Sequence, residues 1–287
     1  MPDTSPREIG FGNYLVAFLD LLGQRDAMRG QGLLPVLQSD SDREAFTRIA
    51  IASIGAVVML QKTSEEIFRG YERHNITHLA KLLPVDAQGL LQDLNAGKIS
   101  TQRWSDGLMH YYSMRGSNIL RDLSAYYALI ARTGSNALIG LARGQPIRGG
   151  IEVSWGVELH ENELYGPAVA NAYALESSIA QYPRIVIGPF AMDYLVHLSA
   201  NTESALDMRV ARVFAMSILD MTFRDHDGAH CVHYLAPEFV KDPDSPHVEL
   251  FPRAMSFVES QLTKHRSCPK LFRRYQQLHA YLLTHAP

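Results

Sequence analysis

The chain has 287 residues, a formal net charge of −3 and hydrophobic residues at 46% of its positions. It is therefore long and apolar enough for one large domain or two small ones, and its charge excludes the global basic field that holds proteins on nucleic acid or acidic membranes. Two cysteines, Cys231 and Cys268, exclude a disulfide scaffold and favour a reducing compartment.

Neither kind of membrane signal is expected in this sequence. The first residues contain no basic segment followed by an apolar core, so we expect no signal peptide. The longest uncharged apolar stretch, 49–60, is shorter than the roughly 20 residues that span a bilayer. We therefore expect a cytoplasmic protein that binds neither membrane nor nucleic acid.

The first strong signal is a buried strand that ends at a carboxylate. Residues 14–19 are apolar, aromatic or β-branched, as in a strand covered on both faces, and Asp20 follows them directly. A carboxylate in such a place is costly to desolvate, so a cation, a helix N-terminus or a hydrogen-bond network must compensate it. Our working hypothesis is a divalent metal ion.

The segment after this strand is predicted to be a helical insert, 24–97. Capping-box patterns at 41–44 and 63–66 each indicate the start of a helix. The first helix is apolar nearly all round from Ile49 onward, which predicts burial in a core or between subunits. The helices expected here are 42–61, 63–74, 76–83 and 86–95.

Strand patterns return at Lys98. Asp106-Gly107 is the tightest hairpin signal in the chain, and it joins the strands predicted over 99–105 and 108–114. The pattern beyond predicts helices at 118–130, 135–142, 168–180, 189–200 and 202–218, strands at 146–159, 164–166 and 182–188, and a hairpin at 221–235. A loop over 236–252 and a helical region broken at Cys268-Pro269 close the chain.

This order of elements predicts an α+β fold, with one mixed sheet and helices packed on it. We expect a catalytic domain at 13–235, which contains the insert, and a C-terminal loop and helical extension at 236–287.

Asp20 and Asp106 are the candidate metal ligands. If the first strand and the hairpin are neighbours in the sheet, the two carboxylates approach one point and repel unless a cation lies between them. Mg²⁺ and Mn²⁺ accept few protein carboxylates when phosphates complete their coordination, as in phosphoryl or nucleotidyl transfer. The alternatives are that Asp106 is only a turn residue and that Asp20 caps a helix.

Five segments in order resemble the catalytic domain of class III nucleotidyl cyclases, and in particular the pyrimidine cyclases of bacterial Pycsar anti-phage systems. The resemblance covers about 15–188 and largely leaves out the helical insert. The segments are Phe18-Leu-Asp20-Leu-Leu-Gly23, Arg103-Trp-Ser-Asp106-Gly107, Arg148-Gly-Gly-Ile, Tyr165 to Glu176, and Tyr182-Pro-Arg-Ile-Val-Ile187.

The resemblance implies a mixed, mainly antiparallel sheet and a homodimer with active sites at the subunit interface. It makes Asp20 and Asp106 the ligands of two Mn²⁺ or Mg²⁺ ions, with the backbone carbonyl of Leu21 as a further ligand. The segment from Phe18 through Leu22 to Gly23 would surround the triphosphate. Arg103 and Trp104 would read and pack the base, although a surface arginine and a core tryptophan explain them equally well.

The chain also departs from the purine cyclases. Alignment on Leu175-Glu176 places Ala170 and Ala174 where those enzymes carry an Asn and the Arg that stabilises the transition state. Charge stabilisation would then come from Arg184, Arg148 or Arg103. Arg148 and Arg184 are equally well explained as structural residues paired with a carboxylate such as Glu176.

The resemblance implies a uridylate cyclase that converts UTP into 3′,5′-cyclic UMP and pyrophosphate, a second messenger in anti-phage defence that acts on a separate effector. The alternatives are a cytidylate cyclase that makes cyclic CMP from CTP and a catalytically dead domain that senses nucleotides. Of the other clusters, His226, His230 and His233 lack a tetrahedral zinc spacing, and the basic C-terminal residues indicate a solvated helix face.

Overall fold

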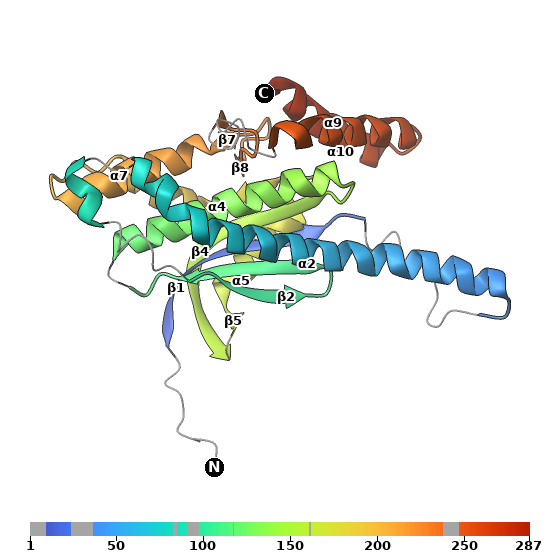
Figure 1. Ribbon diagram of the computed structural model, residues 1–287, viewed down its shortest axis with the longest axis horizontal. Coiled ribbons are helices and arrows are strands. Elements are labelled where there is room, and N and C mark those ends of the chain that lie inside the picture. The colour runs from blue at the N-terminus through green and yellow to red at the C-terminus, as the bar shows by residue number, and fades with distance from the viewer. Residues whose placement is uncertain are drawn as a thin grey trace, which may run out of the picture.

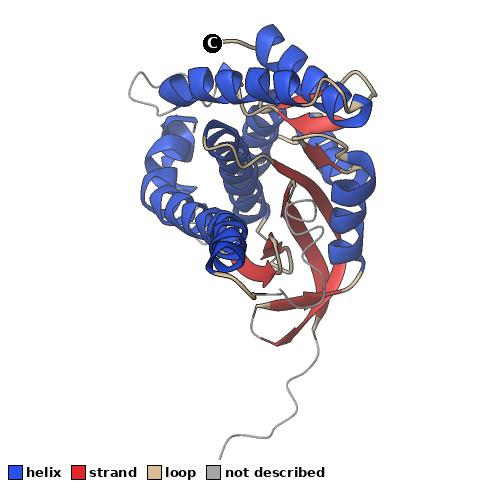
Figure 2. Cartoon of the chain, turned by 90° about the vertical axis from the view of Figure 1, so that its right-hand side faces the viewer, coloured by secondary structure: helices blue, strands red, loops and turns tan. Residues whose placement is uncertain are grey.

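A computed structural model describes residues 10–23, 37–82, 85–90, 98–116, 118–160, 162–237 and 247–287. The chain forms one eight-stranded, mostly antiparallel sheet with helices packed on it, which confirms the predicted α+β class (Figures 1 and 2). The strand order is β2-β3-β1-β4-β6-β8-β7, and β5 pairs with β4. The strands are β1 (Phe11–Leu21), β2 (Ser100–Trp104), β3 (Gly107–Ser113), β4 (Ile147–His160), β5 (Glu163–Tyr165), β6 (Ile185–Ile187), β7 (Thr222–Arg224) and β8 (His230–Val232).

The first strand lies at the centre of the sheet and is buried on both faces, as its unbroken apolar sequence predicts. β1 pairs antiparallel with β3 on one side and β4 on the other. Alternate side chains point to opposite faces, so Leu15, Ala17 and Leu19 enter the main core. Tyr14 and Phe18 enter a smaller cluster on the other face. Asp20 shares the face of Phe18, two residues away.

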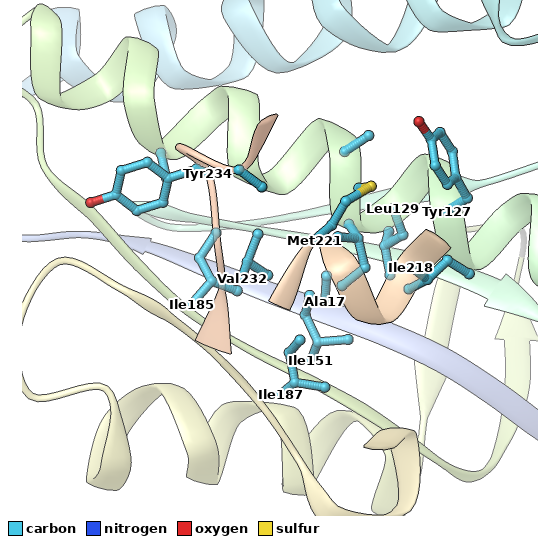
Figure 3. Close-up of a cluster of buried hydrophobic side chains, with 14 of the residues drawn as sticks. Ala17, Tyr127, Leu129, Ile151, Ile185, Ile187, Ile218, Met221, Val232 and Tyr234 are labelled. Atoms are coloured by element: carbon cyan, nitrogen blue, oxygen red, sulfur yellow. The ribbon is translucent and has the colours of Figure 1, made fainter. Parts of the chain in front are cut away.

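Helices cover the two faces of the sheet unequally. The main core joins the sheet to α4, α6, α7, α9 and α10, whereas α5 closes the smaller cluster on the opposite face. Figure 3 shows part of the main core, where Ala17 and Ile151 of the sheet lie near Leu129 of α4. The helices are α2 (Asp40–Leu82), α4 (Ile119–Ala142), α5 (Pro167–Ala174), α6 (Pro189–Ser199), α7 (Leu206–Asp220), α9 (His247–Lys264) and α10 (Pro269–Thr284), with a 3-10 helix η1 (Val85–Leu90) and a π-helical turn η2 (Leu175–Ile179).

The helical insert is built differently from the prediction. The expected helices 42–61, 63–74 and 76–83 are one continuous α2 of 43 residues (Figure 1). The capping pattern at 63–66 does not begin a new helix, because Thr63 and Ser64 are buried against the body of the protein and Ser64 Oγ lies 2.9 Å from His110 Nε2. Of the last predicted helix, 86–95, residues 91–95 lie outside the described part of the chain.

Of the two predicted places for this helix, a core or a subunit contact, the core accounts for only one side of it; burial between subunits stays a prediction. One side of α2 is buried through Ser53, Ala56 and Leu60, whereas Ile51 and Ile54 are 65% and 60% exposed. Within the described residues, one helical stretch, Asp40–Ile67 of α2, is long and apolar enough to cross a membrane. Core helices of soluble proteins pass the same test, so this is weak support for a membrane span.

The structure joins two predicted helices and keeps the predicted break near the C-terminus. The helices expected at 118–130 and 135–142 are one helix, α4, whose first N–H groups are capped by the side chain of Asn118. The predicted break at Cys268-Pro269 does separate α9 from α10. These C-terminal helices share the main core with the sheet through Ala254, Val258 and Leu278, so α9 and α10 pack on the rest of the described chain.

Candidate functional site

The pairing of β1 with β3 brings the two candidate aspartates to the same end of the sheet. Asp20 is directly opposite Gly107, and Gly107 is also opposite Trp104 in β2. The turn is formed by Ser105 and Asp106, with a positive φ of 31° at Ser105. It therefore lies one residue earlier than the predicted Asp106-Gly107 turn. Gly107 instead lies within β3, where a Cβ would be 2.8 Å from the carbonyl oxygen of Leu19.

Asp20 is a carboxylate within a strand and not a helix cap. Its side chain is 20% exposed, and Leu21 after it still pairs with Ile147 of β4. Burial raises the pKa of Asp20, and repulsion from Asp106 raises it further, whereas the charge of Arg148 lowers it. Asp106 precedes the partner of Asp20 in β3 by one residue, so the two aspartates lie at the same end of the paired strands, as the metal hypothesis requires.

Arg148 contacts Asp20 from the neighbouring strand. The two residues are directly opposite in the pairing of β1 with β4. Arg148 Nη2 and Nε lie 3.2 Å and 3.4 Å from Asp20 Oδ2. Arg148 Nε also forms an ion pair with Glu176 Oε1. The carboxylate pairing of Arg148 that the sequence suggested is therefore present, with Asp20 as an additional partner.

Glu176 is the site residue that we did not include among the candidates. Its side chain is only 2% exposed. The pKa of Glu176 is raised to about 7, chiefly because the carboxyl is buried; the charge of Arg148 lowers it, and the charge and hydrogen bond of Asp20 add to the rise. The available signal was the Leu175-Glu176 pair, which we used only to align the sequence and to suggest a structural partner.

Two local features bring Glu176 to the sheet. At Gly150 of β4 a Cβ would lie 2.2 Å from the carbonyl oxygen of Ala172 and 2.9 Å from the amide nitrogen of Glu176. Only glycine therefore lets α5 approach the strand so closely. Beyond Ala174 the helix widens into the π-helical turn η2, which contains Glu176; such turns are frequent at functional sites.

An aromatic cluster lies next to the carboxylates. Trp104 and Tyr173 each pack edge-on against Phe18, with ring centroids 6.1 Å and 5.4 Å away. Phe18 is 6% exposed, whereas Trp104 and Tyr173 are 44% and 53% exposed. The cluster therefore has a buried base and two accessible aromatic rings. Tyr173 was not among the predicted binding residues, since its contact with Phe18 depends on how α5 crosses the sheet.

Arg103 lies at the exposed edge of the sheet, on β2. It forms an ion pair with Glu65 of α2, in which both side chains are about half exposed, at 60% and 45%. This contact connects the helical insert to the strand that carries the predicted base-reading residue. The exposure of Trp104 does not fit the alternative reading of this residue as a core tryptophan.

Arg184 is held away from the carboxylates by other partners. Its guanidinium forms ion pairs with Asp225 and Asp227, the latter at 2.6 Å, and donates to the carbonyl oxygen of Ile179 at 2.7 Å. The side chain is 4% exposed. These contacts favour the structural reading of Arg184, so we leave it out of the candidate site.

The segment that follows Asp20 turns out of the sheet at once. The amide of Leu22 donates to the carbonyl oxygen of Pro146 at 3.0 Å, and Gly23 has a φ of 96°, which favours glycine. The side chain of Leu21 is buried in the main core, which leaves its backbone as the part that the resemblance would use. Residues 24–36 lie outside the description.

The oxygen donors at this site fit a hard divalent cation whose coordination is completed by a bound ligand. In the part of the chain that the structure describes, no group of three or more His, Cys, Asp or Glu side chains is arranged to hold a metal ion. Asp20 and Asp106 supply carboxylate oxygens in a repulsive pair, which suits Mg²⁺ or Mn²⁺ with phosphates in the remaining positions. The histidine cluster has other partners: His226 binds Asp225, and His233 Nδ1 lies 2.9 Å from the hydroxyl of Tyr281.

Comparisons with known proteins add little to this geometry. No family model matches the chain, and no curated protein matches it. One similar solved structure is described as the crystal structure of the guanylyl cyclase Cya2, with a TM-score of 0.34 and 16% sequence identity over 64% of this chain and 79% of that one. A similarity at this level carries no argument, so the assignment below depends on the residues of this chain.

Proposed function

We propose that this chain is a nucleotidyl cyclase that converts UTP into 3′,5′-cyclic UMP and pyrophosphate. The observation that carries the proposal is the placement of two carboxylates, Asp20 and Asp106, at the same end of the paired strands β1 and β3. The exposed aromatic rings of Trp104 and Tyr173 beside this pair support a ligand with both a flat base and phosphates.

In the proposed reaction the 3′-oxygen of the substrate bonds to its own α-phosphorus, the bond to the β-phosphate oxygen breaks, and pyrophosphate leaves. The proton of the 3′-hydroxyl is lost to solvent. Two Mn²⁺ or Mg²⁺ ions would be held by Asp20, Asp106 and the backbone of Leu21. Such ions lower the pKa of the attacking hydroxyl and offset the charge of the triphosphate.

The remaining residues bind and orient the nucleotide. The segment from Phe18 through Leu22 to Gly23 surrounds the triphosphate, and Trp104 packs the base. Arg103 points to the α2 side of β2, opposite to Trp104, and has to leave Glu65 to donate to a base carbonyl. This donation favours UTP because uracil has more carbonyl groups at its edge than cytosine. Among the three arginines that the sequence offered for charge stabilisation, Arg148 is the one in contact with a candidate metal ligand.

The wider setting is part of the same proposal. The enzyme acts as a cytoplasmic homodimer with sites at the subunit interface, and its product is a second messenger for a separate effector in anti-phage defence, as in the pyrimidine cyclases of Pycsar systems. The exposed apolar residues of α2 agree with a subunit contact. The remaining alternatives are a cytidylate cyclase and a nucleotide sensor without turnover.

The test is to incubate the purified protein with each of the four nucleoside triphosphates and Mn²⁺, and to identify products by mass spectrometry. We expect cyclic UMP from the wild type, none from Asp106→Ala, and wild-type amounts from Asp220→Ala, an exposed aspartate at the end of α7. Full activity of a folded Asp106→Ala variant would refute the two-carboxylate mechanism. Tight binding without any cyclic product would favour the sensor.

A further inference from the structure

The guanidinium of Arg148 contacts two carboxylates at the candidate site. Arg148 contacts Asp20 Oδ2 through Nη2 and Nε, at 3.2 Å and 3.4 Å, and forms an ion pair with Glu176 through Nε. Arg148 is 21% exposed and Glu176 is 2% exposed. The arginine therefore lies at the boundary between solvent and a buried acid.

The buried acid needs this partner. An ionised carboxylate that is removed from water is stable only when it is paired or hydrogen-bonded. The close approach at Gly150 and the π-helical turn η2 fix the backbone of Glu176 against β4. Arg148, on the same strand two residues before Gly150, is thus retained at this position by Glu176 whether or not it also touches Asp20.

The contact with Asp20 differs from the contact with Glu176, because Asp20 is also a candidate ligand of the divalent cation. The same oxygen that accepts from Arg148 belongs to the residue that, with Asp106, forms the candidate cation site. A guanidinium and a divalent cation both need the negative charge of Asp20, so each weakens the hold of the other.

We propose that Arg148 is a positioning residue that occupies Asp20 as an internal counter-ion, and that Glu176 holds Arg148 when a divalent cation takes its place. This inference depends on the proposed function, because it assumes that Asp20 binds a cation. Without a cation, Arg148 neutralises the charge of Asp20. When a cation binds Asp20, the displaced guanidinium of Arg148 stays paired with Glu176.

The proposal predicts opposite effects from two neighbouring substitutions. Arg148→Gln removes the competitor, so Mn²⁺ should bind roughly fivefold tighter or more. Glu176→Gln removes the alternative partner and leaves Arg148 on Asp20, so Mn²⁺ should bind weaker than in the wild type. Removal of one charge near a cation site gives these signs in any case, so the double variant Arg148→Gln/Glu176→Gln decides. It removes one charge of each sign, so a merely structural ion pair would leave the affinity for Mn²⁺ unchanged, whereas loss of the competitor for Asp20 raises it.

The experiment measures Mn²⁺ binding to the full chain by electron paramagnetic resonance of free Mn²⁺ at mildly alkaline pH, without nucleotide. Arg143→Gln is the control, because Arg143 is an exposed arginine whose Nη1 lies 2.6 Å from Thr63 Oγ1 on α2. It should bind Mn²⁺ as the wild type does. Since Arg148→Gln leaves Glu176 without its partner, the double variant Arg148→Gln/Glu176→Gln serves where the single variant does not fold, and it should also bind tighter than the wild type.

The metal site and the role of Arg148 are overturned by different results. Unchanged or weaker Mn²⁺ binding by the folded double variant overturns this inference, while the cyclase proposal stands. Absence of Mn²⁺ binding by the wild type, or equal binding by the wild type and Asp106→Ala, overturns the proposed metal site and the inference with it.

Discussion

Asp20 and Gly107 are directly opposite each other in the pairing of β1 with β3. Asp106 is the residue before Gly107, so it lies in the turn next to Asp20. The closeness of the two strands depends on Gly107, where a Cβ would lie 2.8 Å from the carbonyl oxygen of Leu19. The geometry of the carboxylate pair is therefore fixed by backbone packing as well as by the aspartates themselves.

Gly107→Ala should lower the free energy of unfolding by about 1–3 kcal/mol, as expected for overpacking against backbone, and should reduce cyclase activity by moving Asp106. Urea denaturation and product assays measure the two effects. Gly55→Ala is the control, because a Cβ there meets nothing within 4 Å and alanine favours the helix. A Gly107→Ala variant as stable and active as the wild type would contradict the role given to this glycine.

Arg103→Met should lower kcat/KM for UTP more than for CTP, because the lost donor serves a carbonyl of uracil. Its ion pair with Glu65 is solvent-exposed and stabilises the fold by at most about 1 kcal/mol, so the melting temperature should change little. Glu65→Gln separates the two roles, since it breaks the ion pair but keeps the donor. Equal losses for both nucleotides would remove Arg103 from base selection.

Arg184→Met should destabilise the protein by about 3–5 kcal/mol, because it leaves Asp225 buried without its cation. Arg103→Met is the exposed counterpart in the same denaturation experiment and should cost far less. In the fraction that remains folded, KM for UTP should be unchanged by the loss of Arg184. A raised KM with unchanged stability would return Arg184 to the binding site.

His110 should remain neutral well below its ordinary pKa. Its ring lies between Ser64 Oγ and Thr101 Oγ1, each 2.9 Å away, and burial, together with the charge of Arg132, lowers its pKa from 6.5 to about 3. The depressed pKa means that its contribution to stability is complete above pH 6.5 and is lost as the pH falls towards about 3, by about 1.4 kcal/mol per pH unit.

Urea denaturation at a series of pH values tests this dependence. The carboxyls of Asp122 and Glu176 have raised pKa values and therefore act with the opposite sign, gaining stability as the pH falls. The informative quantity is therefore the difference between the wild type and His110→Gln, in which the carboxyl contributions cancel. A difference that does not change with pH would show that His110 is not buried in its neutral form.

Strands and their neighbours were predictable from the sequence wherever the pattern was local. The apolar run before Asp20 fixed a central strand, and the turn signal at Asp106-Gly107 fixed the hairpin to within one residue. The approach of Asp20 to Asp106 required only that β1 pair with that hairpin. Contacts between distant elements were not predictable: Arg184 with Asp225, Tyr173 with Phe18, and the packing of Ser64 that continues α2 through an apparent helix start.

The π-helical turn after Ala174 changes the spacing of the side chains on its C-terminal side. A π-helical turn holds more residues than an α-helical one, so residues beyond Ile179 do not lie on the faces that uninterrupted helical spacing assigns to them. Ala170 and Ala174 come before the turn, within α5, and keep regular helical spacing. The side chain that α5 presents beside Phe18 is Tyr173. This side of the candidate site is therefore lined by an aromatic ring, which can pack on a flat ligand but supplies no charge.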